Sequence, residues 1–148
     1  IKSLNPNFGK MIYTNIGLWN ERTNLKFFKQ SNEKHVSQSL IESMFSNKFD
    51  IVNVNTIKNI MQENNHKKID LLKIDIEGAE IEVLNKMFDD KIYPRYVLVE
   101  FDLFIKQKDP ENKTKKIIER MLFQEHYTVL KNDRMNITFQ LNGGNNYT

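Results

Sequence analysis

Residues 69–80, which read I-D-L-L-K-I-D-I-E-G-A-E, decide the fold predicted for this chain. Apolar residues dominate the first part of the stretch, as in a buried parallel strand. Two-residue alternation places Lys73, Asp75 and Glu77 on one face of that strand, where charges are unfavourable unless they are paired or reach a solvated crevice. Open α/β sheets bind ligands at the carboxyl ends of their strands. The stretch therefore predicts the rim of an active site.

A simpler interpretation of the same residues is structural. Glu77 and Glu80 lie at or near the start of the following helix, where unpaired backbone N–H groups favour negative charge. Lys73 would then serve only as an ion-pair partner.

The composition indicates a globular domain. The 148 residues fit one domain, and no apolar run approaches the roughly 20 residues needed to span a bilayer. Cysteine is absent, which excludes disulfides and thiolate sites. The net charge is only +3, and basic residues alternate with acids instead of forming a stripe, so we expect no nucleic-acid partner. We expect a cytoplasmic protein.

Predicted strands and helices alternate along the chain, which favours an α/β fold. A closing hairpin adds an antiparallel edge to a sheet that is otherwise mostly parallel, and the tail 143–148 is predicted to be disordered. The predicted elements are a hairpin of strands 11–19 and 25–29 around the turn 20–23, a short helix at 40–45, a strand at 49–54, a helix capped by Thr56, a strand at 69–76, a helix over 81–88, a strand at 96–101, a helix capped near Thr114, and a hairpin of strands 127–130 and 136–141.

Residues 70–84, D-L-L-K-I-D-I-E-G-A-E-I-E-V-L, strongly resemble the signature of FkbM-type methyltransferases, a branch of the S-adenosylmethionine-dependent class I fold. Weaker similarities extend this resemblance over residues 11–141. They lie at 15–19 and 25–28, which are similar to the family's third strand and hairpin, at 35–39, at 97–101 (its fifth strand) and at 136–139 (its last strand).

The resemblance implies a Rossmann-like sheet, S-adenosylmethionine as cofactor, and O-methylation of a hydroxyl on a sugar, lipid or small metabolite. A carboxylate at the position of Asp75 can orient that hydroxyl and accept its proton. The implied site residues fall into three groups: catalytic Asp75, Glu77 and Lys73; cofactor-binding Gly17, Leu18 and Asp75; and substrate-binding His35, Ser37 and Glu100.

One departure from the family pattern is serious. The family carries a glycine-rich turn after its first strand and an acidic residue after its second, whereas Gly9 and Gly17 are isolated here. In the class I strand order the missing first strands lie between the third and the fourth. We therefore expect residues 1–142 to be the carboxy-terminal part of a longer methyltransferase domain, with weak or no cofactor binding on their own.

Other interpretations stay open. Asp70, Asp75, Glu77 and Glu100 could form a carboxylate cluster for Mg²⁺, as in phosphoesterases and nucleases, although Asp70 starts the strand and lies roughly 15 Å from Asp75. We expect no metal. The chain could also be a non-catalytic interaction module, and His35 and Ser37 could belong to a solvated loop.

Overall fold

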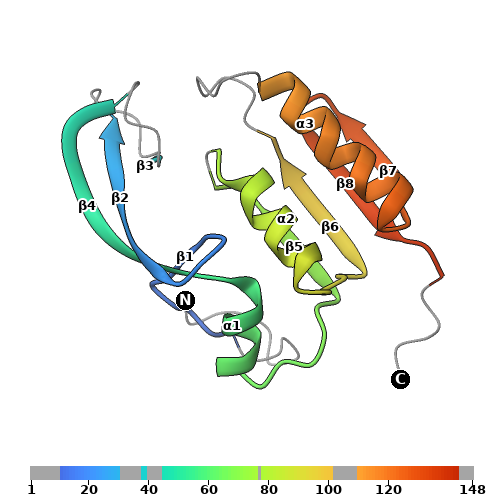
Figure 1. Ribbon diagram of the computed structural model, residues 1–148, viewed down its shortest axis with the longest axis horizontal. Helices are drawn as coiled ribbons and strands as arrows, with labels where there is room; N and C mark the ends of the chain where they lie inside the picture. The colour runs from blue at the N-terminus through green and yellow to red at the C-terminus, as the bar shows by residue number, and fades with distance from the viewer. Residues whose placement is uncertain (1–10, 31–37, 40–44, 77, 102–109, 144–148) are drawn as a thin grey trace, which may run out of the picture.

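The chain folds into two four-stranded sheets with helices beside them (Figure 1). The computed structural model describes residues 11–30, 38–39, 45–76, 78–101 and 110–143. In spatial order, the first sheet contains β1 (Gly17–Leu18), β4 (Phe45–Asn55), β2 (Thr23–Gln30) and β3 (Gln38–Ser39), and the second contains β5 (Leu71–Ile74), β6 (Tyr96–Glu100), β8 (Asn136–Leu141) and β7 (Tyr127–Asp133). The helices are α1 (Ile57–Glu63), α2 (Glu80–Asp89) and α3 (Pro110–Glu119), which continues into a π-helical turn at Arg120–Gln124.

The first sheet differs from the predicted hairpin. β1 has only two residues and does not pair with β2, because β4 lies between them. β4 pairs antiparallel with β2, so that Leu25 lies opposite Val52, and parallel with β1, so that Gly17 lies opposite Val54. The physical reason is the length of β4, whose 11 residues offer β2 more backbone partners than the two-residue β1 can.

The strand predicted at 49–54 is confirmed and is longer, since β4 begins at Phe45. The helix predicted at 40–45 is wrong at Phe45, which lies in that strand, and residues 40–44 fall outside the described part of the chain. The cap predicted for α1 is confirmed, because the Thr56 hydroxyl accepts a hydrogen bond from the Asn59 N–H at 3.2 Å.

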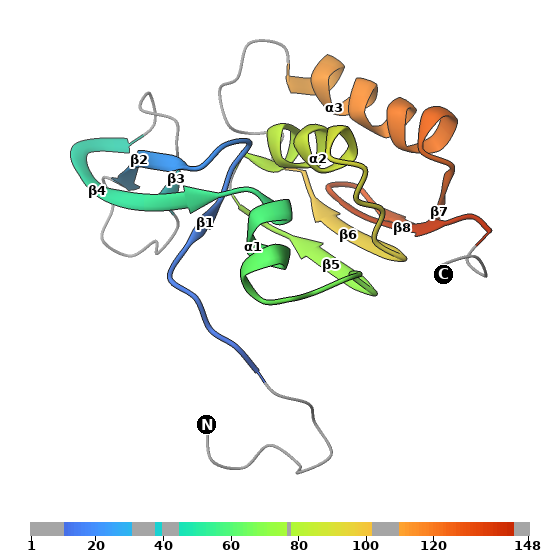
Figure 2. The ribbon, with the colours of Figure 1, turned by 60° about the horizontal axis from the view of Figure 1, so that its bottom comes forward.

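The second sheet contains the strand predicted at 69–76, shortened to β5, and both strands of the predicted closing hairpin. Helices α2 and α3 cover one of its faces (Figure 2). On that face Ile74, Val99 and Phe139 are buried against Leu84 and Met121 of the helices and the π-helical turn. This core fixes the sheet and therefore the position of the residues at its strand ends.

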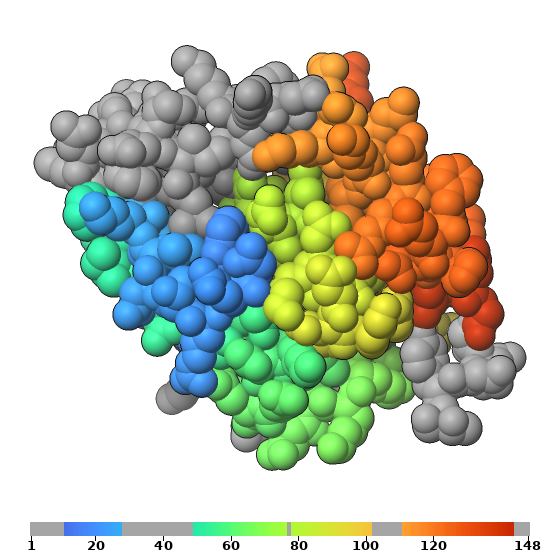
Figure 3. All heavy atoms as spheres, viewed as in Figure 1, coloured from blue at the N-terminus to red at the C-terminus, as the bar shows by residue number. Residues whose placement is uncertain are grey.

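Helix α3 begins at Pro110, four residues before the predicted cap at Thr114. Proline is favoured at the first helical position because it lacks the N–H that would be unpaired there. Helices α2 and α3 lie side by side on the molecular surface (Figure 3). Among the described helices, none combines the length and the apolar character that a membrane crossing requires.

The α/β class is confirmed, but the expectation of one mostly parallel sheet is not met. Among the described strands, β1–β4 and β5–β6 pair in parallel and the other four pairings are antiparallel. The parallel pair β5–β6 is joined by the crossover helix α2, as such pairs require. The two sheets are separate, and β1 and β5 are edge strands within them. Of the tail predicted to be disordered, residues 144–148 lie outside the described residues.

Candidate active site at the end of strand β5

Asp75 follows directly after β5, at the carboxyl end of the parallel pair β5–β6. The Lys73 ammonium donates a hydrogen bond to Asp75, with Nζ and Oδ2 2.9 Å apart, and both side chains are exposed. Strand alternation puts both residues on the face of the sheet opposite α2 and α3. The structure thus brings together two of the three predicted catalytic residues. Glu77, the third, lies outside the described residues.

Lys73 also borders a hollow of about 280 Å³ that opens on the same face. Glu100, predicted as a substrate-binding residue, ends β6 and lines this hollow. Six of its nine lining residues are polar or charged, and the full lining comprises Lys73, Leu98, Val99, Glu100, Lys131, Asp133, Asn136, Ile137 and Thr138. The hollow thus shares Lys73 with the Lys73–Asp75 pair, but Asp75 itself is not one of its lining residues. The other predicted substrate residues, His35 and Ser37, fall in a part of the chain that the structure does not describe.

A tight turn connects β5 to α2. Gly78 has a φ of 102°, in the left-handed region that favours glycine, so the turn requires the glycine of the sequence motif. Ala79 precedes the helix and provides no side-chain cap. Glu80 is 3% exposed, and its carboxylate accepts hydrogen bonds from the Ile76 and Gly78 N–H groups. The sequence indicates that Glu80 lies near the helix start but does not reveal that this acid is buried, so it does not assign Glu80 to the site.

Gly17 and Leu18, predicted to bind the cofactor, lie in β1 of the other sheet. A Cβ on Gly17 would lie 3.0 Å from Cγ1 of the buried Val54, so close packing of β1 on β4 accounts for this glycine. Leu18 packs against the hydrophobic core. No hydrogen bond or ion pair identified among the described residues connects these two residues to the Lys73–Asp75 pair.

The carboxylates of the Mg²⁺ interpretation do not converge where the structure describes them. Asp70 pairs with Lys68 at 3.0 Å, at the amino end of β5, away from Asp75. Within the described residues no group of three or more His, Asp or Glu side chains is arranged to hold a metal ion.

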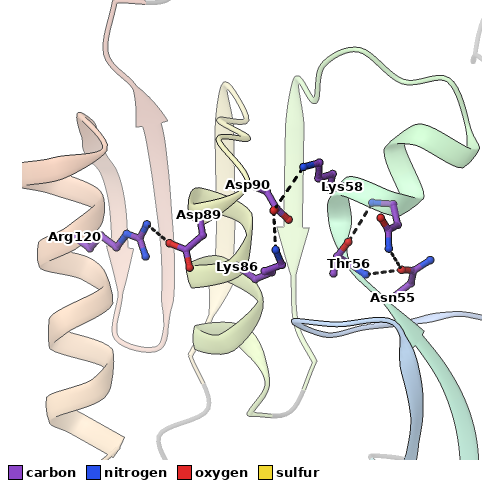
Figure 4. A network of polar contacts seen from close by, with 8 residues as sticks. Asn55, Thr56, Lys58, Lys86, Asp89, Asp90 and Arg120 are labelled. Atoms are coloured by element: carbon purple, nitrogen blue, oxygen red, sulfur yellow. Dashed lines mark hydrogen bonds and ion pairs between the residues drawn. The ribbon is translucent and has the colours of Figure 1, made fainter.

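Polar contacts stabilise α1, α2 and the π-helical turn (Figure 4). The buried Asn55 side chain accepts hydrogen bonds from the Thr56 N–H and the Asn59 side-chain amide at the start of α1. Asp90, at the end of α2, accepts from Lys86 at 2.7 Å and lies 3.9 Å from Lys58 of α1. The Lys58–Asp90 pair thus links α1 to α2, while the Asn55 bonds fix the start of α1, so we assign these contacts a structural role.

A comparison with known protein families identifies the family of this chain. Residues 4–138, which include most of both sheets, match the methyltransferase FkbM domain. The chain belongs to the FkbM methyltransferase family. Comparisons with curated proteins and with solved structures gave no match. FkbM membership confirms the resemblance carried by residues 70–84 and supports methyl transfer as the chemistry of the chain.

Proposed function

We propose that this chain is an S-adenosylmethionine-dependent methyltransferase that methylates a hydroxyl group of a sugar, lipid or small metabolite. The observation that carries the proposal is the position of Asp75, an exposed carboxylate at the carboxyl end of a parallel strand pair in an FkbM chain. That is where open α/β sheets hold their ligands. We further propose that the chain has the Rossmann-like character of its family in the β5–α2–β6 unit.

The donor chemistry of the site suits the cofactor in one respect. S-Adenosylmethionine supplies a methyl group on a positively charged sulfonium, and the Asp75 carboxylate offers the complementary negative charge. We propose Gly17 and Leu18 as cofactor contacts on family resemblance alone. Packing against Val54 and the core already explains why these two residue types occur there.

Asp75 can act on the acceptor as well. A carboxylate within hydrogen-bond reach of a hydroxyl orients the O–H and accepts its proton as the oxygen forms its new bond to carbon. Lys73 donates to Oδ2 and leaves Oδ1 free of that contact, so Lys73 orients the carboxylate. The hollow beside Lys73 combines apolar surface with the polar residues Glu100, Asn136 and Thr138, which supports a small, hydroxyl-bearing acceptor.

Isothermal titration calorimetry with S-adenosylmethionine and S-adenosylhomocysteine tests the proposal without knowledge of the acceptor. We expect weak binding of both ligands, since the sequence lacks a glycine-rich turn, so the titration extends to millimolar ligand. Asp75→Asn should weaken S-adenosylmethionine binding about fivefold, because a partly exposed charge pair contributes at most about 1 kcal/mol. S-Adenosylhomocysteine, which lacks the sulfonium charge, should be affected less.

The chain provides a matched control for this experiment. Asp70 is an exposed aspartate that pairs with the lysine two residues before it, just as Asp75 does, but at the opposite end of β5. Asp70→Asn should therefore leave both affinities unchanged. A folded wild-type chain that binds neither ligand, or equal effects of the two substitutions, would contradict the proposal.

A further inference from the structure

Among the described acids next to the candidate site, Glu80 is the most deeply buried. It is 3% exposed, although it begins α2 and follows a turn. Its Oε1 lies 3.0 Å from the Ile76 nitrogen and 3.1 Å from the Gly78 nitrogen, and its Oε2 lies 3.0 Å from the Gly78 nitrogen. A buried carboxylate is tolerated only where such donors compensate it, so the burial of Glu80 depends on the shape of this turn.

The direction of these hydrogen bonds is unusual for the start of a helix. A residue before the helix normally caps the first N–H groups with its side chain, but Ala79 makes no such bond. Glu80 instead reaches backward, as the glutamate of a capping box does, and binds two N–H groups that precede the helix. The carboxylate therefore stabilises the turn between β5 and α2, in addition to the helix itself.

Asp75 lies between two fixed points of the backbone. On one side, Ile74 is held in the β5–β6 ladder, where it pairs with Val99. On the other side, the Ile76 N–H is bound by Glu80. Hydrogen bonds therefore hold the backbone on both sides of Asp75. The left-handed conformation of Gly78 shapes the turn in which Glu80 makes its bonds.

We propose that Glu80 is a positioning residue, which holds the turn so that Asp75 presents its carboxylate at the strand end. The inference rests on the function proposed above for Asp75. Small displacements of a catalytic group reduce catalysis strongly, by roughly a hundredfold for 1 Å. Glu80 would therefore serve catalysis by holding the turn, in addition to stabilising the helix.

Glu82 provides a matched control, because it lies in the same first turn of α2 but is exposed. The test compares Glu80→Gln, Glu80→Ala and Glu82→Gln in the full chain. Glutamine keeps one carbonyl acceptor but loses the charge and the second oxygen, so it should rescue part of what alanine loses. The first readout is amide hydrogen exchange by NMR at Ile76 and Gly78, with Val97 and Val99 of the central strand β6 as reference.

We expect exchange at Ile76 and Gly78 to accelerate roughly tenfold to hundredfold in Glu80→Gln, the range that loss of a charge-assisted hydrogen bond implies, and more in Glu80→Ala. Exchange at Val97 and Val99 should change little, and Glu82→Gln should match the wild type. Unchanged exchange at Ile76 and Gly78, an equal increase at all four amides, or the same effect from Glu82→Gln would overturn the assignment. If Glu80→Ala does not fold, the Glu80→Gln comparison alone decides.

The second readout is calorimetric affinity for S-adenosylmethionine. Glu80→Gln should weaken it severalfold and Glu82→Gln should not. A wild-type chain that does not bind the ligand defeats the proposed function, but the exchange experiment still tests whether Glu80 holds the turn. A turn that loosens while the affinity stays at the wild-type value overturns the positioning role and leaves the function intact.

Discussion

Arg120 is the residue whose removal should destabilise the second sheet and its helices most selectively. It lies at the start of the π-helical turn, and its side chain is 22% exposed. It donates to Glu125 at 2.9 Å, to Asn85 at 3.0 Å and to Asp89 at 2.8 Å, and its guanidinium lies 5.4 Å from the centre of the Phe88 ring. Burial lowers the pKa of Arg120, but its hydrogen bonds to Asp89 and Glu125 and their charges outweigh burial and raise the pKa, so the side chain stays charged.

We expect Arg120→Met to reduce the free energy of unfolding by about 3 kcal/mol. The contact with Asp89, which is 62% exposed, contributes at most about 0.5 kcal/mol of this. The larger part, about 2 kcal/mol, comes from Glu125, which is 10% exposed and would lose its cationic partner. That figure lies below the roughly 3–5 kcal/mol of a broken buried pair because Tyr93 still hydrogen-bonds Glu125. The bond to Asn85 supplies the remainder.

Urea denaturation followed by circular dichroism measures this change, with Lys115→Met as the control. Lys115 and Glu119 form an exposed pair, 3.8 Å apart on α3, so the control should change stability by less than about 0.5 kcal/mol. Adding Glu125→Gln to Arg120→Met removes the unpaired buried charge and should restore about 1 kcal/mol. Arg120 does not have this structural role if Arg120→Met is no more destabilising than the control, or if Glu125→Gln destabilises the variant further.

Two more predictions concern packing and pH. Gly17→Ala should reduce the free energy of unfolding by about 1 kcal/mol, because the added Cβ would press on Cγ1 of the buried Val54. In a Val54→Ala background this loss should vanish. A urea midpoint that rises in Gly17→Ala would show that packing does not require the glycine and would leave it free for a cofactor role. Burial, and then the charge and hydrogen bond of Glu125, raise the pKa of Tyr93 in the folded chain, against a smaller lowering by Arg120. The stability that this neutral phenol contributes is fully present below its unfolded pKa of about 10 and is lost as the pH rises through its higher folded value. Tyr93→Phe should therefore flatten the alkaline decline in unfolding free energy, and parallel wild-type and variant curves above pH 10 would disprove the assignment.

Local patterns in the sequence predict the second sheet well. β5, β6 and the β7–β8 hairpin each bury their own apolar residues, such as Ile74, Val97 and Phe139, so alternation along the chain is enough to locate them. The first sheet is harder because its pairing joins distant segments. The polar turn at 20–23 has the composition of a hairpin, and nothing local reveals that β4 inserts between the strands on either side.

The same limit applies to the site. The pairing of Lys73 with Asp75 follows from strand alternation, and the structure has it. The hydrogen bonds of Glu80 to the turn depend on the left-handed Gly78 and on the burial of one particular acid. The motif contains several acids, and composition and spacing do not reveal which of them is buried. Two of the Arg120 hydrogen bonds, to Asn85 and Asp89, join residues more than thirty positions apart and have no local signal, whereas its bond to Glu125 is local.

Chemical-shift mapping of S-adenosylmethionine binding on the ¹⁵N-labelled chain tests the central claim most directly. As ligand is added, the largest shifts should fall on the amides of Lys73, Asp75, Ile76 and Gly78 at the carboxyl end of β5, with little change at Lys68 and Asp70 at its other end. Shifts confined to other surfaces, such as the hollow of about 490 Å³ beside Arg95 and Thr128, or no shifts at millimolar ligand in a folded chain, would contradict it.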